Sequence, residues 1–418
     1  MASPKINELL ATAKAADDQA AAYDSLLENI QTYSTPATVE ADMKAIATSI
    51  FTNDLRVVAL RSLLERFINA LRGFEKADLT VAVGQHTLDI IAAQPSATFL
   101  DQVASLRELM AGAHETNEDF LEAAKTLAEI PLDAAQRKVS DEERAAVWVR
   151  IVRNYLEVDD TTSAETYLNK LKIIIYAVSD PALNLHFRLS QARIQDAKRE
   201  FLSASSAYHT ISQSPTITED ERLHTLAMAA RCAILAPAGP LRNRALARIC
   251  NDERAVNLDD FGLLQKMFLN QLIPAHEVEK FAKGLAPHQL ALTSDGSTVL
   301  AKAVVEHNLL AASRVYLNIS FDALGELLGL DANRAEDTTA KMIEQGRLVG
   351  RIDQIEQYIY FERREASGEK GSGRAEVTVG KEMRQWDANV QGVSEEVENI
   401  TNALQRAFPD FVASTLSA

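Results

Sequence analysis

Apolar and polar positions alternate with a helical period through the first two thirds of the chain. From Ile6 to about Leu292, apolar residues recur every three or four positions, and short polar stretches separate the periodic segments. This pattern predicts consecutive helices of roughly 12 to 20 residues. Ser140 and Thr218 each have a glutamate three positions later, an arrangement in which both side chains can cap a helix start. We expect residues 1–293 to be almost entirely helical.

A weak internal repeat underlies this helical region. Three alanines, Ala123, Ala164 and Ala204, are separated by 41 and 40 positions. Each is followed four and seven positions later by apolar residues, a spacing that lets two helices pack closely against each other. The pattern favours tetratricopeptide-like repeats of paired helices, and the alternative is a chance recurrence in an alanine-rich chain. The apolar followers are Leu127, Ile130, Leu168, Leu171, Tyr208 and Ile211.

The pattern changes beyond residue 294, where helical and strand periods alternate over short segments. A predicted helix at residues 297–308 precedes a β-branched and aromatic segment, residues 313–319, that predicts a strand. Ser320 and Asp331 can each cap a short helix. Two further strands, expected at residues 348–352 and 357–361, would form a hairpin. Together these elements predict a winged-helix domain over residues 294–364.

The C-terminal part of the chain contains a polar segment and then a long periodic one. Residues 365–380 are rich in glycine and serine, which predicts a flexible linker. Residues 381–411 are predicted to form a helix with one narrow apolar stripe at heptad spacing. The stripe can pack onto this chain's own winged helix or enter a bundle with other chains, and we favour the bundle because a lone helix cannot bury it. The stripe residues are Trp386, Val390, Val393, Val397, Ile400, Leu404 and Phe408.

Composition and charge narrow the class of protein. Apolar residues make up 47% of the chain and charged residues 24%, as in globular proteins that bury a core. Because 43 basic residues face 59 acidic ones, the net charge is −16, which disfavours binding to a nucleic-acid backbone. Cys232 and Cys250 cannot form a disulfide framework, and no apolar run approaches the ~18 residues of a membrane helix. Since the start also lacks a signal-peptide pattern, the sequence predicts a soluble intracellular protein with no membrane partner.

A winged helix contains a helix-turn-helix, so DNA binding is an alternative function. The segment that would enter the major groove, residues 331–346, has two basic and four acidic side chains. Its net charge of −2 opposes contact with phosphates. Arg347 and Arg351 on the wing are the remaining candidates for such contact. A scaffold role is therefore favoured over nucleic-acid binding.

The sequence shows no pattern of catalytic residues. The glycine-rich segment 368–374 lacks both the preceding strand and the Gly-Lys-Ser/Thr of a phosphate loop. The eight histidines show no metal-ligand spacing, and neither a nucleophile elbow nor the kinase signatures occur. We predict no catalytic, metal-binding or cofactor-binding residues, no cofactor and no enzymatic activity.

Several segments resemble the PCI-domain family of scaffold subunits, which occurs in the proteasome lid, the COP-nine signalosome and a translation initiation factor. Helical repeats followed by a winged helix and a C-terminal helix are the organisation of that family. Glu-His-Asn-Leu-Leu at 306–310 and Ile-Asp-Gln-Ile at 352–355 resemble the signalosome's fourth subunits rather than their proteasome counterparts. Further similar segments are residues 232–236, 251–254, 287–289, 303–310, 312–321 and 350–355.

The resemblance implies a PCI module over about residues 195–364 and a place in the COP-nine signalosome. That complex removes a ubiquitin-like modifier from cullins and so regulates cullin–RING ubiquitin ligases. The implied role is a non-catalytic scaffold and substrate-sensing subunit, in cytoplasm and nucleus, whose N-terminal repeats reach toward the cullin–RING ligase. The zinc isopeptidase would be another subunit. Two alternatives are the paralogous PCI scaffold subunit of the proteasome lid and a winged-helix nucleic-acid-binding regulator.

Two surfaces are expected to bind neighbouring signalosome subunits. Unpaired strand edges near residues 315–319 or 358–361 can continue a sheet into the next winged helix. The resemblance suggests the seventh and second subunits as those neighbours. The apolar stripe of residues 381–411 would enter a helical bundle made with other subunits. The predicted interface residues of the winged helix are Val315, Leu317, Ile319, Tyr358 and Tyr360.

Overall fold

The computed structural model describes residues 3–16, 19–52, 56–74, 76–94, 98–132, 137, 139–293, 296–362, 381–409 and 411–412. The chain divides into two compact units, which are taken one at a time below. The first consists of Met1–Ala236, Arg248–Phe261 and Leu285–Ala291, and the second of Pro237–Ala247, Gly262–Gly284 and Leu292–Ala418. The predicted linker, residues 365–380, lies outside the described residues.

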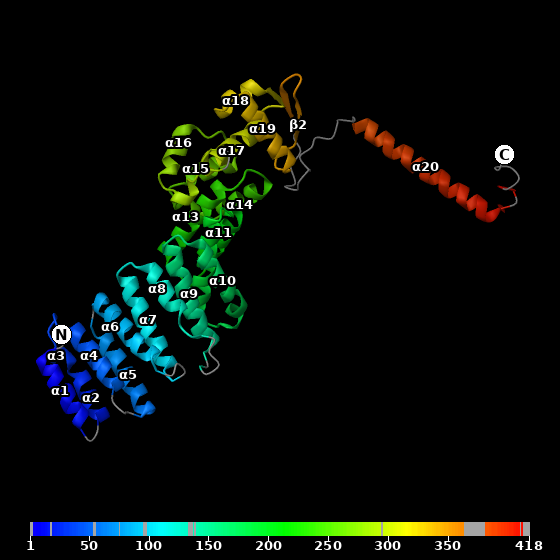
Figure 1. The fold of residues 1–418 in the computed structure, drawn as a ribbon. Helices are drawn as coiled ribbons and strands as arrows, with labels where there is room; N and C mark the ends of the chain where they lie inside the picture. The colour runs from blue at the N-terminus through cyan, green and yellow to red at the C-terminus, as the bar shows by residue number, and fades with distance from the viewer. Residues whose placement is uncertain are drawn as a thin grey trace. The chain divides into compact units, whose positions relative to one another are not determined.

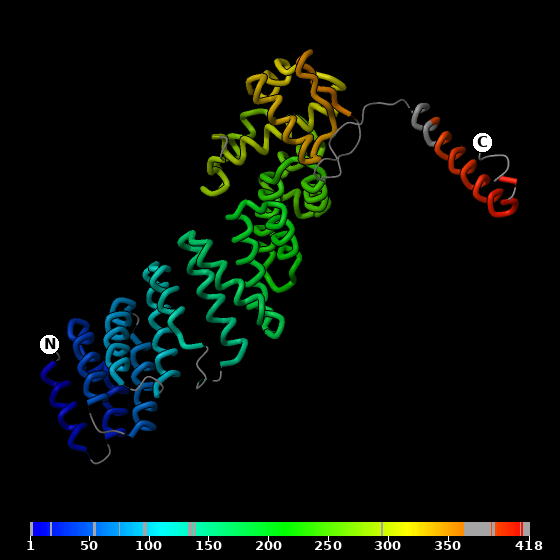
Figure 2. The backbone as a smooth tube through the Cα atoms, turned by 45° about the vertical axis from the view of Figure 1, so that its right-hand side comes forward, coloured from blue at the N-terminus to red at the C-terminus, as the bar shows by residue number. Residues whose placement is uncertain are grey.

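The first unit is a series of α-helices in which successive helices lie side by side and antiparallel, as Figures 1 and 2 show from two directions. Each helix buries one apolar face; α5, for example, buries Leu63, Phe67 and Leu71, spaced by four residues. The helices are α1 (Pro4–Ala15), α2 (Gln19–Glu28), α3 (Ile30–Tyr33), α4 (Val39–Thr52), α5 (Val57–Arg72), α6 (Ala77–Ala92), α7 (Leu100–Thr116), α8 (Phe120–Ala128), α9 (Asp141–Glu157), α10 (Thr161–Ile174), α11 (Pro181–Ala197), α12 (Phe201–Ser212) and α13 (Glu219–Leu235). This unit also contains three short 3₁₀ segments, Ile175–Ala177 between α10 and α11, and Glu253–Asn257 and Pro287–Gln289 after α13.

The three repeat alanines occupy equivalent positions in this unit. Ala123, Ala164 and Ala204 are the fourth residues of α8, α10 and α12, and all three are fully buried. The turn before each of these helices contains a residue with positive φ, a left-handed conformation that ends the preceding helix. Those residues are Glu118, Asp159 and Arg199, so the turn recurs at the same spacing as the alanines. Both the buried alanine and the backbone turn therefore repeat with each helix pair.

The two predicted helix caps differ in detail. At Thr218 the hydroxyl accepts from the Glu221 N–H and the Glu221 carboxylate accepts from the Thr218 N–H, so both halves of the capping box form. At Ser140 the hydroxyl accepts from the Glu143 N–H at 3.2 Å. The Glu143 carboxylate instead binds the Arg137 guanidinium. An ion pair with a residue six positions earlier has therefore taken the place of the second capping bond.

The second unit contains the winged helix. Ser320 and Asp331 cap their helices as expected, accepting from the N–H groups of Ala323 and Arg334. Gly329 ends the first of these helices with φ +69°, a conformation that favours glycine. The elements of this part of the chain are α14 (Pro240–Cys250), α15 (Phe261–Phe268), α16 (Ala275–Ala282), α17 (Val299–Val315), β1 (Asn318–Ser320), α18 (Phe321–Leu328), α19 (Ala332–Glu344), β2 (Gly350–Asp353), β3 (Tyr358–Phe361) and α20 (Lys381–Ala407).

The three strands form one antiparallel sheet in the order β1-β3-β2. Asn318 lies opposite Tyr360, and Ile352 lies opposite Ile359. A Cβ atom at Gly350 would lie 2.7 Å from the Tyr360 carbonyl oxygen, so this close approach of two strands requires glycine. The core beneath the sheet is apolar and contains Leu309, Phe321, Leu324, Met342, Ile359 and Phe361.

Two local expectations about the winged helix are wrong. Residues 313–315 belong to α17, because the helix continues to Val315 and the strand begins only at Asn318. Tyr358–Phe361 is the central strand rather than an edge, since β1 from the start of the domain pairs with it on the side away from β2. Among the described residues, the unpaired edges of this sheet are those of β1 and β2. The fold class, mainly α with helical repeats, a winged helix and a long C-terminal helix, is confirmed.

Candidate functional site

Three consecutive residues of α17 connect several segments of the second unit; we refer to Glu306, His307 and Asn308 as the polar triplet. The Glu306 carboxylate is buried and accepts from both terminal nitrogens of Arg347, with Arg347 Nη2 at 3.0 Å. It also accepts from the Ala238 N–H at 3.1 Å. One carboxylate thereby holds Arg347, which lies between α19 and β2, and the segment before α14.

The next residue, His307, binds a fully buried arginine. Arg242 of α14 is 0% exposed and donates from Nη2 to His307 Nδ1 at 2.9 Å. Since Nδ1 accepts, the proton of the neutral ring lies on Nε2, which donates to the Gln271 carbonyl at 2.8 Å. Burial and the neighbouring Arg242 guanidinium lower the pKa of His307 to about 4, so the ring is neutral at pH 7. Burial lowers the pKa of Arg242 to about 10, which leaves the guanidinium charged.

The third residue, Asn308, binds both backbone groups of one residue. Its Oδ1 accepts from the Ile273 N–H at 3.0 Å, and its Nδ2 donates to the Ile273 carbonyl at 3.3 Å. The polar triplet therefore holds α14 and the segment before it, the segment before α16, and Arg347 between α19 and β2 against one helix. The first three residues of the Glu-His-Asn-Leu-Leu motif at 306–310 therefore make contacts inside the protein rather than forming a surface site.

The arginines proposed for phosphate contact are both engaged. Arg347 is largely buried by its pairing with Glu306 and also donates to the Ala238 carbonyl at 3.1 Å. The Arg351 guanidinium lies 4.3 Å from the centre of the Tyr360 ring, a cation–π contact. On α19, Arg334 lies 3.9 Å from the Asp331 carboxylate. The basic side chains of the winged helix that could contact a phosphate are thus engaged with other side chains, and the segment that would enter the major groove is acidic.

The exposed part of the predicted strand-edge surface lies where α17 leads into β1. Val315 is exposed and Leu317 is 61% exposed, while the Leu317 carbonyl accepts from the Phe361 N–H at 2.8 Å. Tyr358 lies opposite Ser320 and is exposed, and Tyr360 is half-buried. Ile319 is only 7% exposed because its side chain packs in the winged-helix core. Because the Leu317 carbonyl and the Phe321 N–H both bond toward β3, the alternation of an antiparallel ladder turns the backbone groups of Ile319 toward β3 as well. Asn318 is a β1 residue whose backbone groups face the open edge.

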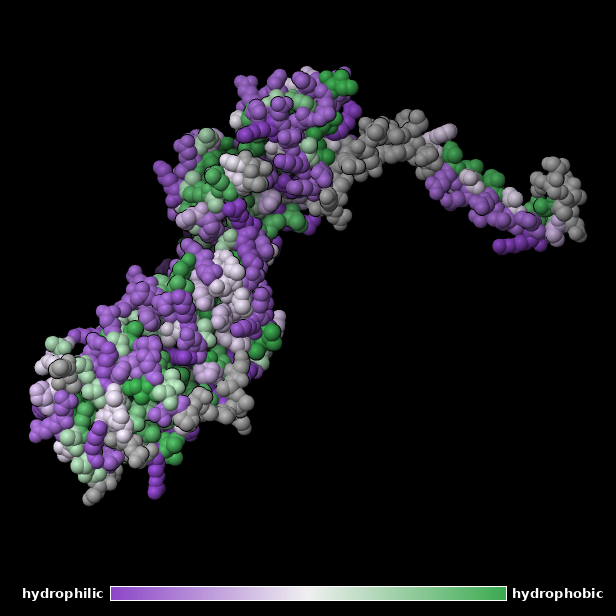
Figure 3. Space-filling model, in the orientation of Figure 1, coloured by the Kyte–Doolittle hydropathy of each residue, from purple (hydrophilic) through white to green (hydrophobic). Residues whose placement is uncertain are grey.

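The seven residues of the predicted C-terminal stripe share one side of α20 and its immediate continuation. All of them are exposed except Leu404, which is half-buried. Figure 3 shows an apolar side and a polar side along this helix. Phe408 lies just beyond the end of α20 and donates its N–H to the Leu404 carbonyl. Such a stripe is typical of a helix that packs against another apolar surface.

Sequence reasoning missed several surface residues. Tyr316 adds an aromatic ring beside Val315 and Leu317, and Phe411 extends the C-terminal stripe by one more exposed apolar residue. The spacing of three residues after Phe408 could have identified Phe411. Ile355, at the tip of the wing, is 96% exposed, and its position in a turn carries no such signal.

Another motif segment of the resemblance makes internal contacts in the first unit. Gln289 donates from Nε2 to both oxygens of the buried Asp196 carboxylate, at 3.1 and 3.0 Å. His288 Nε2 lies 3.3 Å from the same carboxylate. In this way Pro287–Gln289 is tied to α11. Like the polar triplet, this motif stabilises the fold.

Two searches of the described residues are relevant to function. Within the part of the chain that the structure describes, no three histidine, cysteine, aspartate or glutamate side chains cluster so that they could hold a metal ion. Among the helices described, none has both the length and the apolar character needed to cross a membrane. The arrangements that stand out are the β1 edge and the α20 stripe, both of them interaction surfaces.

Comparison with known proteins gives a consistent answer along the chain. Residues 4–220 match the family described as PSMD12/CSN4, N-terminal, and residues 258–363 match the PCI domain. The COP9 signalosome complex subunit 4 of Neurospora crassa is 55% identical over 99% of this chain and 98% of that protein. Its counterpart in Emericella nidulans is 46% identical over 90% of this chain and 91% of its own length, and that of Dictyostelium discoideum 38% over 89% and 90%. The chain therefore belongs to the family of COP9 signalosome complex subunit 4, whose C-terminal region is a PCI domain.

Proposed function

We propose that this protein is a non-catalytic scaffold subunit of a COP9 signalosome. The observation that carries the proposal is the similarity, over nearly the full length of both chains, to proteins named as subunit 4 of that complex. The internal role of the polar triplet agrees with a scaffold, because these polar side chains hold other segments of the same chain in place. In this proposal the complex removes the ubiquitin-like modifier from cullins, and another subunit supplies the isopeptidase.

Two surfaces of the second unit are proposed to bind other subunits. The first is the unpaired edge of β1 with the exposed side chains Val315 and Leu317 beside it, and with Tyr358 and Tyr360 on the adjoining strand. Main-chain groups of an edge strand can pair with a strand of a neighbour, and apolar side chains add contact area. The second is the stripe on α20, which we propose enters a bundle of C-terminal helices from several subunits.

The helical repeats of the first unit are proposed to contact the cullin–RING ligase and so help the complex sense its substrate. This part of the proposal rests on the family resemblance. Stacked helix pairs offer long surfaces of the kind that repeat proteins use to bind partners. We further propose that the protein occurs in both cytoplasm and nucleus, where the complex would meet its substrates.

The test is affinity purification of the tagged full-length chain from its own cells, followed by mass spectrometry. Recovery of the other signalosome subunits in comparable amounts would support the proposal, whereas recovery of proteasome-lid subunits would support the paralogous alternative. An untagged strain is the control for nonspecific capture. A second assay asks whether the purified chain alone cleaves a modified cullin; metal-dependent cleavage would overturn the non-catalytic part of the proposal.

A further inference from the structure

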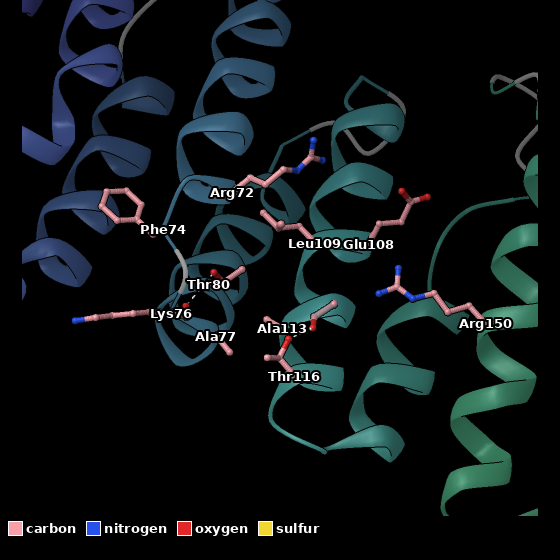
Figure 4. A pocket seen from close by; sticks show the side chains of 11 residues that line it. Arg72, Phe74, Lys76, Ala77, Thr80, Glu108, Leu109, Ala113, Thr116 and Arg150 are labelled. Carbon is pink, nitrogen blue, oxygen red and sulfur yellow. Dashed lines mark hydrogen bonds between the residues drawn. The ribbon is translucent and has the colours of Figure 1, made fainter.

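A cleft of about 470 Å³ lies in the first unit between the α5–α6 connection, α6, α7 and α9. Figure 4 shows the side chains that line it. Ala77, Leu109 and Ala113 form apolar parts of its wall, and Arg72, Lys76 and Arg150 bring positive charge. A concave site of this size that combines apolar walls with a few charged groups is of the kind that binds a ligand or a short segment of a partner.

The charge of the cleft is opposite to that of the chain as a whole. Three basic side chains line it, Arg72, Lys76 and Arg150, and the one acidic side chain among the lining residues is Glu108. The complete chain has a net charge of −16. Arg72 and Lys76 are exposed, and within the described ranges, which omit Glu75 between them, neither makes an ion pair. Because Arg150 pairs with Glu115, the positive charge without an ion-pair partner among the described lining residues comes from Arg72 and Lys76.

Arg150 is held in place by a network beneath the cleft. Its Nε and Nη2 each donate to Glu115, to Oε1 and Oε2, both at 2.7 Å. Glu115 Oε1 also accepts from Asn154 Nδ2 at 2.8 Å. These bonds use two of the five N–H groups of the guanidinium, so the remaining donors are oriented in advance. In Figure 4 the Arg150 side chain reaches from α9 toward α7.

The residue opposite this guanidinium on α7 is a glycine. A Cβ atom at Gly112 would lie 3.3 Å from Arg150 Nη2, closer than ordinary van der Waals contact. With glycine there, the arginine can lie against the helix without displacement. The cleft therefore combines a fixed guanidinium from α9, a second arginine at the end of α5 and an apolar wall from α7.

We propose that this cleft binds an acidic segment of a partner protein, with a carboxylate between Arg72 and Arg150 and a neighbouring apolar side chain against Leu109. Arginine pairs with carboxylates through two parallel hydrogen bonds, which suits a fixed guanidinium. The apolar wall favours a peptide over a bare anion, and Glu108 opposes the higher charge of a phosphate group. The site goes beyond the scaffold role proposed above, since it does not depend on which complex the protein joins.

The experiment measures binding of a short fluorescein-labelled peptide of glutamates around one leucine to the full-length chain, by fluorescence anisotropy. The same peptide with glutamine in place of glutamate is the probe control. Arg72→Glu should weaken binding about tenfold, because it reverses a charge that contacts the ligand. Glu108→Gln should strengthen binding about threefold by removing the opposing carboxylate. Arg188→Glu, an equal charge change at an exposed site on α11 outside the cleft, should leave the affinity nearly unchanged.

Each result either supports or overturns the proposal. Equal losses in Arg72→Glu and Arg188→Glu would show a general effect of net charge and overturn it, as would equal binding of the glutamine peptide. Unchanged melting temperatures of the variants exclude misfolding as the cause of a loss, and Glu108→Gln tests the site through a gain that misfolding cannot produce. Displacement of the peptide by inorganic phosphate or single-stranded DNA more readily than by its unlabelled copy would identify a phosphate site and overturn the assignment to an acidic segment.

Discussion

The winged helix buries polar side chains, whereas α20 exposes apolar ones. In the winged helix, the polar triplet binds Arg242 and Arg347 within the chain, although Arg242 Nε and Nη1 lie buried without a hydrogen-bond partner among the described residues. On α20, a row of seven apolar residues has little cover. Buried polar groups cost free energy unless they are paired, and exposed apolar stripes cost free energy unless a partner covers them. The first region therefore stabilises the fold of the chain, and the second is suited to joining other chains.

The largest effect is expected from deleting the chain from Lys381 onward. Burial of each large apolar side chain contributes about 1.5–3 kcal/mol, so loss of the stripe should abolish incorporation into the complex. The melting temperature of the isolated chain should change little, because the stripe is exposed there. Co-purification with the other subunits and thermal melting are the two measurements.

A finer version of the same experiment uses substitutions in the full-length chain. Val393→Asp with Ile400→Asp places two charges on the stripe, and Asn389→Asp with Asn402→Asp places them on exposed positions off it. Only the first pair should prevent assembly. If the truncated chain still assembles, or if both pairs act alike, the stripe is not an intermolecular surface.

The next largest effect is expected within the polar triplet. Glu306→Ala leaves the buried Arg347 charge and the Ala238 N–H without their acceptor, which should cost about 3–5 kcal/mol of unfolding free energy. Urea unfolding of the full-length chain, followed by circular dichroism, would measure this cost.

A matched double variant separates two contributions to the loss of stability, the unpaired buried charge and the changed shape of the site. Glu306→Gln keeps an acceptor for Ala238, and adding Arg347→Leu removes the unpaired charge, so the double variant should recover much of the loss. The same double variant should leave assembly through α20 intact if the two regions act independently. A loss below about 1 kcal/mol for Glu306→Ala would show that the ion pair is not a main contributor to the stability of this unit.

A pH-dependent loss of stability is expected from His307. Its pKa is about 4 in the folded chain and near the ordinary value of 6.5 in the unfolded chain. Below pH 6.5 the unfolded chain binds a proton that the folded chain does not, so the free energy of unfolding falls as the pH decreases toward 4. The total loss in this window is about 3 kcal/mol.

The measurement is urea unfolding at a series of pH values. His307→Gln, whose amide can replace both hydrogen bonds, should flatten the stability profile between pH 6.5 and 4 relative to the native chain. His276→Gln, at an exposed histidine, is the control and should leave the slope unchanged. A native slope retained in His307→Gln would assign the pH dependence to other groups.

Local features of this fold could be predicted from the sequence, and long-range pairings could not. The caps at Thr218, Ser320 and Asp331 and the stripe on α20 depend on residues within a few positions of one another. The placement of β1 beside β3 depends on segments far apart in the chain, and the sequence offered residues 315–319 and residues 358–361 as alternative edges. The burial of Arg242 is an example of a feature that the sequence does not predict.

That arginine lies in a segment, Pro240–Cys250, which is rich in arginine and has the sequence character of an exposed helix. It is nevertheless fully buried and donates to His307, more than sixty positions later, while its Nε and Nη1 have no hydrogen-bond partner among the described residues. Likewise, the sequence makes Arg347 a candidate for phosphate contact, whereas in the structure it pairs with Glu306. A charge can be assigned to surface or interior only when its partner is known.

The smallest effect is expected at the β1 edge, and it tests whether the winged helix too has an outward-facing role. Leu317→Asp puts a charge on an exposed apolar side chain while its carbonyl still accepts from Phe361, so the chain should fold normally. Loss of one apolar contact at an interface should cost about 1.5 kcal/mol, or roughly a tenfold weaker association with the neighbouring subunit. Ile355→Asp, at the exposed wing tip away from the β1 edge, should leave association unchanged. Quantitative co-purification of both variants would measure the difference. If Leu317→Asp associates as well as Ile355→Asp, the β1 edge is not an interface, and assembly through α20 would remain the only intermolecular role proposed for the second unit.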